Sequence, residues 1–187
     1  MIDGGTMNFQ HFARLDLAFS LLCLQHKFSQ PVAKISRCIS RTGDGHLYAL
    51  LLALGWWFGQ SAPTDSAETQ FSKTGLWAFA LELPLYWLAK NSFKRRRPHE
   101  LSQLIRVSFT PSDKYSLPSG HTAAAFVMAT LIGQFYPSFY LLALCWACLI
   151  GLSRILLGVH FITDVFIGAL LGIACAKMAM LLVGVAL

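Results

Sequence analysis

The chain has 187 residues, of which 55% are hydrophobic and 13% are charged, and it carries a formal net charge of +6. Several apolar stretches approach the length of a bilayer, so the composition excludes a water-soluble globular domain and indicates an integral membrane protein. A backbone inside lipid must satisfy its own hydrogen bonds, so we expect one all-α domain over residues 1–187, a polytopic bundle of transmembrane helices.

Residues 1–45 are predicted to form an interfacial N-terminal region. Within residues 9–24, apolar side chains recur near one helical face: Phe12, Leu15, Phe19 and Leu22. Arg14 and Asp16 interrupt this apolar run. We therefore interpret the segment as an amphipathic interfacial helix, with a short first transmembrane helix as a nearly equal alternative. The segment lacks the charged, apolar and small-residue order of a cleaved signal peptide, so we expect the membrane helices themselves to direct insertion.

Five apolar helices are predicted after this region. A polar and basic stretch ends in a turn at residues 42–45, and the helices follow at 46–59, 76–89, 120–136, 139–152 and 161–187. The first two are shorter than the roughly 20 residues that a membrane helix needs, so they must use flanking residues. With the N-terminal segment, the count is five or six membrane helices.

Three polar blocks lie at the ends of these apolar segments, in a catalytic motif region over residues 90–164. They are Lys90 with Arg97 and Pro98, then Pro118-Ser119-Gly120-His121, then Ser153-Arg154 with His160 and Asp164. An even number of predicted crossings separates the second block from the third, and the first two share one connection. All three blocks therefore face the same water layer, where their side chains can converge.

The residue types in these blocks suit phosphoryl transfer, which needs positive charge around the phosphate oxygens, an in-line nucleophile and an acid for the leaving oxygen. Lys90, Arg97 and Arg154 supply the cations. Ser119 and Gly120 begin a helix, so a hydroxyl and backbone N–H groups are expected to point toward an anion.

The two histidines take the roles of nucleophile and acid. His160 and Asp164 are four residues apart and are expected to share a helical face, so the carboxylate fixes the tautomer and leaves the other ring nitrogen free to attack phosphorus. His121 protonates the leaving oxygen and then activates water to hydrolyse a phosphohistidine. We expect no metal and no cofactor, because the three cations take that role and the chain lacks a carboxylate or Cys/His cluster.

These three blocks, with their order and spacing intact, resemble the signature of the type 2 phosphatidic acid phosphatase (PAP2) superfamily, in its bacterial integral-membrane form. The resemblance covers Lys90 to Asp164 and the helical layout. It implies a six-helix core, a nucleophile at His160 and an acid at His121, supported by Asp164. It also implies phosphate binding by Lys90, Arg97, Ser119, Gly120, Arg154 and, through its hydroxyl or backbone, Ser153.

Other residues have structural interpretations. Two charges of the basic run at residues 94–97 are expected to act only as topology anchors. Asp44, Asp113 and His99 either line the pocket mouth or are turn residues, and the turn is favoured. Glu82, an acid within an apolar span beside Pro84, is assigned equally to structure and to a substrate channel. Gly168 and Gly172 are predicted to pack the last helix against a neighbour.

Two indications of sidedness disagree. By the helix count, all Lys and Arg residues except Lys73 and Lys177 lie on the catalytic side, which favours a cytoplasmic site by the positive-inside rule. The family resemblance implies a site on the outer face. We expect a bacterial inner-membrane protein whose active site faces the extracytoplasmic side.

The location suits a phosphate headgroup on a lipid whose tail stays in the bilayer, so the main hypothesis is a metal-independent lipid phosphatase. The resemblance suggests an isoprenyl pyrophosphate such as undecaprenyl pyrophosphate, phosphatidylglycerol phosphate, or phosphatidic acid. The alternatives are an enzyme similar to vanadate-dependent haloperoxidases and a non-catalytic membrane protein that binds lipid or anions. No nucleic-acid partner is expected, and the oligomeric state stays open.

Overall fold

The computed structural model describes residues 16–18, 30–61, 63, 66–101 and 113–186. In these residues every regular element is a helix, which confirms the all-α prediction for this part of the chain. The elements are α2 (Gln30–Thr42), α3 (Gly45–Gly59), α4 (Ala67–Phe93), α5 (Pro98–Leu101), α6 (Gly120–Phe135), η1 (Pro137–Phe139), α7 (Tyr140–Leu156) and α8 (Ile162–Val183).

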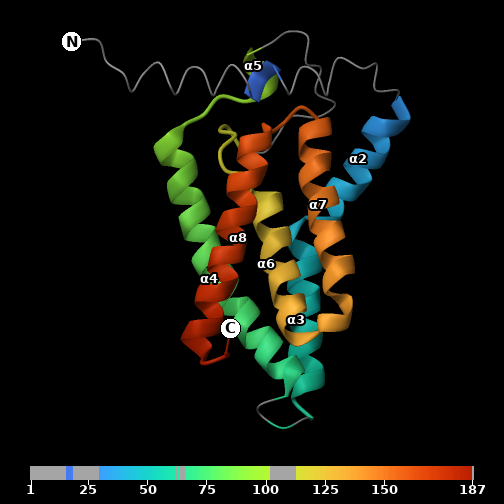
Figure 1. Cartoon of the computed structure of the whole chain (residues 1–187), viewed down its shortest axis with the longest axis vertical. Helices are drawn as coiled ribbons and strands as arrows, with labels where there is room; N and C mark the ends of the chain where they lie inside the picture. The colour runs from blue at the N-terminus through green and yellow to red at the C-terminus, as the bar shows by residue number, and fades with distance from the viewer. Residues whose placement is uncertain (1–15, 19–29, 62, 64–65, 102–112, 187) are drawn as a thin grey trace, which may run out of the picture.

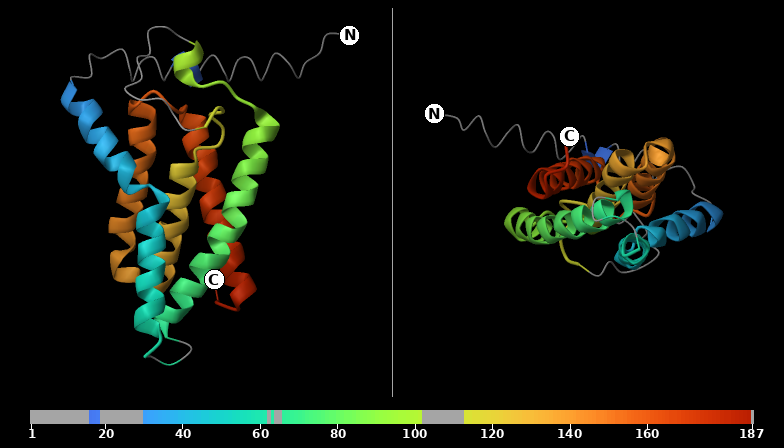
Figure 2. Two further views of the ribbon diagram at one scale, coloured as in Figure 1. Left: turned by 180° about the vertical axis from the view of Figure 1, so that it is seen from behind. Right: turned by 90° about the horizontal axis from the view of Figure 1, so that it is seen from below.

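The long helices run side by side, and α6 lies at the centre of the bundle (Figure 1). It packs against α4, α7 and α8. Figure 2 shows α8 and α3 on opposite sides of α4, which packs against both. The side chains of α6 that face inward are small or apolar, among them Ala123, Ala125 and Val127, so neighbouring helices approach its backbone closely.

Gly168 and Gly172 make the contact between α8 and α6. An added Cβ at Gly168 would lie 2.6 Å from the carbonyl oxygen of Ser119, and one at Gly172 would overlap the carbonyl oxygen of Ala123. Only a residue without a side chain allows this approach, so the predicted packing of the last helix through these two glycines is confirmed.

Two segments differ from their predictions. Helix α4 begins at Ala67 rather than at residue 76, because its polar first turns are satisfied by α3: the Ser72 hydroxyl donates to the carbonyl of Leu52 at 2.9 Å. The basic stretch before residue 42 is a helix, α2, which packs against α7 and buries Ser36 and Ser40.

By length and composition, two of the described helical segments are able to cross a membrane: Pro137–Leu156, which joins η1 to α7, and Ile162–Val183. Helices α3 and α6 have 15 and 16 residues, and α4 contains charged side chains, so the predicted count of five or six spans stays a prediction. The amphipathic helix predicted over residues 9–24 lies outside the described residues except for 16–18.

Candidate active site

The structure brings the three polar blocks together at one end of the bundle, where α4 ends, α6 begins and α7 connects to α8 (Figure 1). Two hydrogen bonds join them directly. The Ser119 N–H donates to the carbonyl of Asp164 at 3.0 Å, and Nη1 of Arg97 donates to the carbonyl of Val159 at 2.7 Å. The first and second blocks are therefore both anchored to the third.

His160 is almost fully buried, with 2% of its surface exposed. Its Nδ1 lies 3.6 Å from Oδ2 of Asp164, just beyond hydrogen-bond distance. Burial lowers the pKa of His160 to about 3, with Asp164 acting in the opposite direction and the charge of Arg154 adding to the decrease. The imidazole is therefore neutral at physiological pH, and the nitrogen turned away from Asp164 keeps its lone pair.

The pair forms differently from the sequence prediction. His160 lies before the start of α8 at Ile162, so the two residues do not share a helical face. Instead, Asp164 in the first turn folds back toward the preceding loop, where its Oδ2 accepts the backbone N–H of Phe161 at 2.8 Å. This capping contact brings the carboxylate next to the imidazole.

Arg95 holds the other oxygen of Asp164. Its Nη1 donates to Oδ1 of Asp164 at 2.9 Å, and its Nη2 donates to Oδ2 of Asp16 at 2.7 Å. From the sequence, two unspecified charges of the run at residues 94–97 are expected to act only as topology anchors, and Arg95 is not assigned to the site. No local pattern marks Arg95, because its partner is 69 residues away in the chain.

The second block forms the first turn of α6. Ser119 is the N-cap residue and is fully buried, with its Oγ 2.9 Å from the hydroxyl of Thr122. His121 lies in the same turn, and its Nε2 is 2.9 Å from Oδ1 of Asp44. Asp44 precedes α3, and the favoured interpretation as a simple turn residue missed this contact. Gly120 is the first residue of α6, where the backbone N–H groups and the helix dipole favour an anion.

Lys90 and Arg97 converge on a carboxylate that sequence reasoning assigned to a turn. Lys90 contacts Oδ2 of Asp113, and Nη2 of Arg97 contacts Oδ1 of the same residue. Tyr86 also donates its hydroxyl to Asp113, at 2.6 Å. Arg97 is 1% exposed, and its guanidinium also donates hydrogen bonds to the backbone carbonyls of Asp113 and Tyr115. Asp113 thus occupies the two cations that the sequence assigns to phosphate.

The remaining residues of the third block sit at the end of α7. Nη1 of Arg154 donates to the hydroxyl of Ser40 on α2 at 2.6 Å, and the side chain is 5% exposed. Ser153 is also buried, and its hydroxyl donates to the carbonyl of Ile150 at 2.6 Å. The hydroxyl of Ser153 is therefore engaged by its own helix, whereas the charge of Arg154 acts on both histidines.

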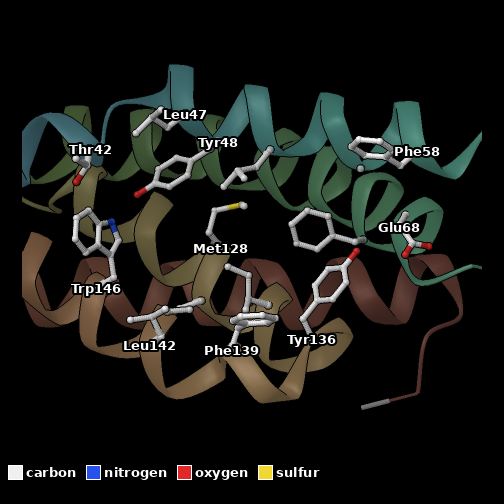
Figure 3. A pocket seen from close by; sticks show the side chains of 16 residues that line it. Thr42, Leu47, Tyr48, Phe58, Glu68, Met128, Tyr136, Phe139, Leu142 and Trp146 are labelled. Atoms are coloured by element: carbon white, nitrogen blue, oxygen red, sulfur yellow. The ribbon is translucent and has the colours of Figure 1, made fainter.

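A groove of about 880 Å³ leads from this site along α3 and α4. At one end it is lined by Asp44, Gly120 and His121, and farther along by Glu82 and apolar side chains. A second groove of about 690 Å³ lies between α3, α6 and α7 (Figure 3). Figure 3 shows Leu142, Met128 and Trp146 turned into this hollow, and none of the polar blocks lines it. The first groove is the one that opens on the site.

In the described part of the chain, no group of three His, Cys, Asp or Glu side chains is arranged to hold a metal ion. Lys90, Arg97 and Arg154 are cationic side chains buried at this end of the bundle.

Known proteins share both the sequence pattern and the fold. The model of the PAP2 superfamily matches residues 74–186. Phosphatidylglycerophosphatase B of Bacillus subtilis (strain 168) is 34% identical over 88 residues, in an alignment that covers 40% of this chain and 43% of that protein. The match thus spans less than half the length of this curated relative.

Two crystal structures have similar folds. Aquifex aeolicus LpxE superposes with a TM-score of 0.75 at 28% identity, covering 89% of this chain and 94% of that one. The first transmembrane PAP2 type phosphatidylglycerolphosphate phosphatase from Bacillus subtilis gives a TM-score of 0.74 at 22% identity, covering 93% and 87%, and shows the fold alone. The family model covers more than half of the chain, including all three polar blocks, and the chain therefore belongs to the PAP2 superfamily.

Proposed function

We propose that this protein is an integral membrane phosphatase that hydrolyses the phosphate headgroup of a lipid through a phosphohistidine at His160, without a metal ion. The observation that carries the proposal is the buried, neutral His160 beside Asp164, at a point where three cationic side chains and His121 converge.

In the first step, Nε2 of His160 attacks phosphorus and the bond from phosphorus to the lipid oxygen breaks. His121, in its cationic form, gives a proton to the leaving oxygen, so the lipid alcohol departs neutral; the negative charges of Asp44 and of the bound phosphate favour that cationic form. Lys90, Arg97 and Arg154 balance the negative charge on the phosphate oxygens. The backbone N–H groups at the start of α6 donate hydrogen bonds to the same oxygens. For this, the phosphate must displace Asp113 from Lys90 and Arg97.

In the second step, water attacks the phosphohistidine. His121 takes a proton from the water, the P–N bond breaks, and orthophosphate leaves with His160 again neutral. Asp44 accepts a hydrogen bond from His121 and so orients its ring in both steps. Asp164 stabilises the positive charge that His160 carries as it forms the bond.

The substrate that we propose is a phosphate monoester or pyrophosphate lipid: phosphatidylglycerol phosphate, phosphatidic acid or an isoprenyl pyrophosphate. The name of the Bacillus subtilis relative, phosphatidylglycerophosphatase B, supports the first of these. We propose a location in the bacterial inner membrane with the site facing the extracytoplasmic side.

Phosphate release by the detergent-purified protein, from a panel of these lipids in EDTA, tests the proposal. We expect release to continue in EDTA and to vanish in His160→Ala. No release from any lipid, or equal release by the variant, would overturn the catalytic assignment. Release that requires added metal would overturn the metal-free mechanism alone.

A further inference from the structure

Glu82 is a buried carboxyl group that the phosphatase mechanism does not use. It lies in α4 with 2% of its surface exposed, and no other described residue forms a hydrogen bond or an ion pair with it. An acidic group held among apolar side chains without a partner costs considerable free energy, and a hydrogen-bonding partner from outside the protein would offset that cost.

Glu82 is one of the lining residues of the groove that opens on the active site. Glu82 lines this groove together with Tyr86 and His121. Glu82, Tyr86 and Lys90 follow one another at intervals of four residues, so they lie on one face of α4. A polar stripe therefore runs from the groove to the cation that is proposed to bind phosphate.

The distance between Lys90 and Glu82 indicates which part of a bound lipid lies next to Glu82. Eight residues of helix separate Glu82 from Lys90, about 12 Å at 1.5 Å per residue. A lipid whose phosphate sits at Lys90 places its linker and the first atoms of its tails at this depth. In an acylated lipid those atoms include the ester or amide carbonyl oxygens, whereas an isoprenyl chain presents only hydrocarbon there.

The chemistry of the two groups is complementary. In apolar surroundings without a cation, the neutral form of a carboxyl group has a lower free energy than the charged form, and this neutral form has one O–H donor. An acyl carbonyl oxygen is an acceptor with no donor of its own. Their hydrogen bond satisfies a group that the described residues leave unpaired.

We propose that Glu82 is a substrate-binding residue that donates a hydrogen bond to the acyl carbonyl of the lipid, and that the enzyme thereby selects acylated lipid phosphates over isoprenyl ones. The proposal rests on the proposed function and narrows its substrate class.

The test compares two lipids that differ only in the carbonyl. Diacyl phosphatidic acid and its dialkyl ether analogue of equal chain length are hydrolysed in the same mixed micelles, and kcat and KM are measured for each. We expect the kcat/KM of the wild-type protein to be about tenfold higher for the diacyl lipid than for its dialkyl analogue, mainly because the KM of the diacyl lipid is lower. Ceramide 1-phosphate, with an amide carbonyl, shows whether the ester or any acyl linkage is accepted.

Two variants assign the preference to Glu82. Glu82→Gln keeps an N–H donor and is expected to retain the preference, whereas Glu82→Met keeps the length of the side chain and is expected to hydrolyse both lipids equally. The matched control is Glu68→Met, at the other end of the same helix and outside this groove. It is expected to retain the preference.

The outcomes separate the two proposals. If the wild-type protein hydrolyses both lipids with equal kcat/KM, the role of Glu82 is refuted while the phosphatase function stands. A preference that survives in Glu82→Met refutes it as well. If Glu82→Met does not fold, loss of the preference in Glu82→Gln refutes the role of Glu82. The comparison of the two lipids with the wild-type protein needs no variant and tests the preference by itself. If the wild-type protein hydrolyses no lipid phosphate, the proposed function itself fails.

Discussion

Gly168→Ala is expected to reduce catalysis by moving the phosphate seat, although Gly168 touches no substrate. The new Cβ would lie 2.6 Å from the carbonyl oxygen of Ser119, and ordinary van der Waals contact begins at 3.4 Å. Helix α8 and the start of α6 must therefore separate by about 0.8 Å. The same separation stretches the hydrogen bond from the Ser119 N–H to the carbonyl of Asp164, now 3.0 Å long.

A displacement of this size between phosphate seat and nucleophile lowers kcat/KM by about 10-fold to 100-fold. The overlap itself is expected to cost about 1–3 kcal/mol of stability. The assay is kcat/KM for hydrolysis of a lipid phosphate in micelles, together with thermal unfolding of the detergent-solubilised protein.

The matched control is Gly133→Ala. Its Cβ would also lie 2.6 Å from a neighbour, in this case Cδ2 of Tyr140, at the end of α6 away from the site. It is expected to lose stability while keeping kcat/KM within about threefold of the wild-type value, because the phosphate seat does not move. If folded Gly168→Ala keeps kcat/KM within about twofold of wild type, the coupling of helix packing to the site is refuted.

Three further predictions concern the charges of the site. Asp113→Asn is expected to lower the inhibition constant of orthophosphate about tenfold, because phosphate no longer displaces a carboxylate from Lys90 and Arg97; an unchanged or higher constant would contradict this. Arg95→Gln is expected to lower kcat about 10-fold to 100-fold with little change in KM, since Asp164 loses its charged partner, and full single-turnover activity would show that this contact is dispensable. The pKa of His160 is lowered to about 3, so the nucleophile is protonated only as the pH falls toward that value. The rate of phosphoenzyme formation in single turnovers is therefore expected not to fall as the pH is lowered through 6.5, the ordinary pKa of histidine. A fall in this range that the ionisation of the substrate does not account for would refute a neutral buried His160.

The sequence predicts the apolar helices well, because long apolar runs need no tertiary information to be recognised. Helix α3 was expected from residue 46 and begins at Gly45. The first turns of α4 were missed, because Ser72 satisfies its hydroxyl on the backbone of α3, a contact between residues 20 positions apart. Polarity alone indicated a loop there.

The same division holds in the site. The residues of the three blocks are recognisable from fixed local spacing, and the structure gathers them at one end of the bundle. Asp44, Asp113 and Arg95 were not assigned to the site, because each contacts it across a long stretch of chain: Asp44 lies 77 positions from His121. Only the packing of the bundle, with α3 against α4 and α4 against α6, brings Asp44 to His121, and no local motif records it.

The most direct test of the account is to trap the covalent intermediate. His121→Ala lacks the group that activates water, so with an aryl phosphate, whose leaving group needs no acid, the phosphorylated protein is expected to accumulate. Peptide mass spectrometry after a rapid alkaline quench should find the phosphoryl group on His160, and none in the protein that also carries His160→Ala. A phosphoryl group on another residue, or hydrolysis by His121→Ala without any adduct, would contradict the histidine mechanism.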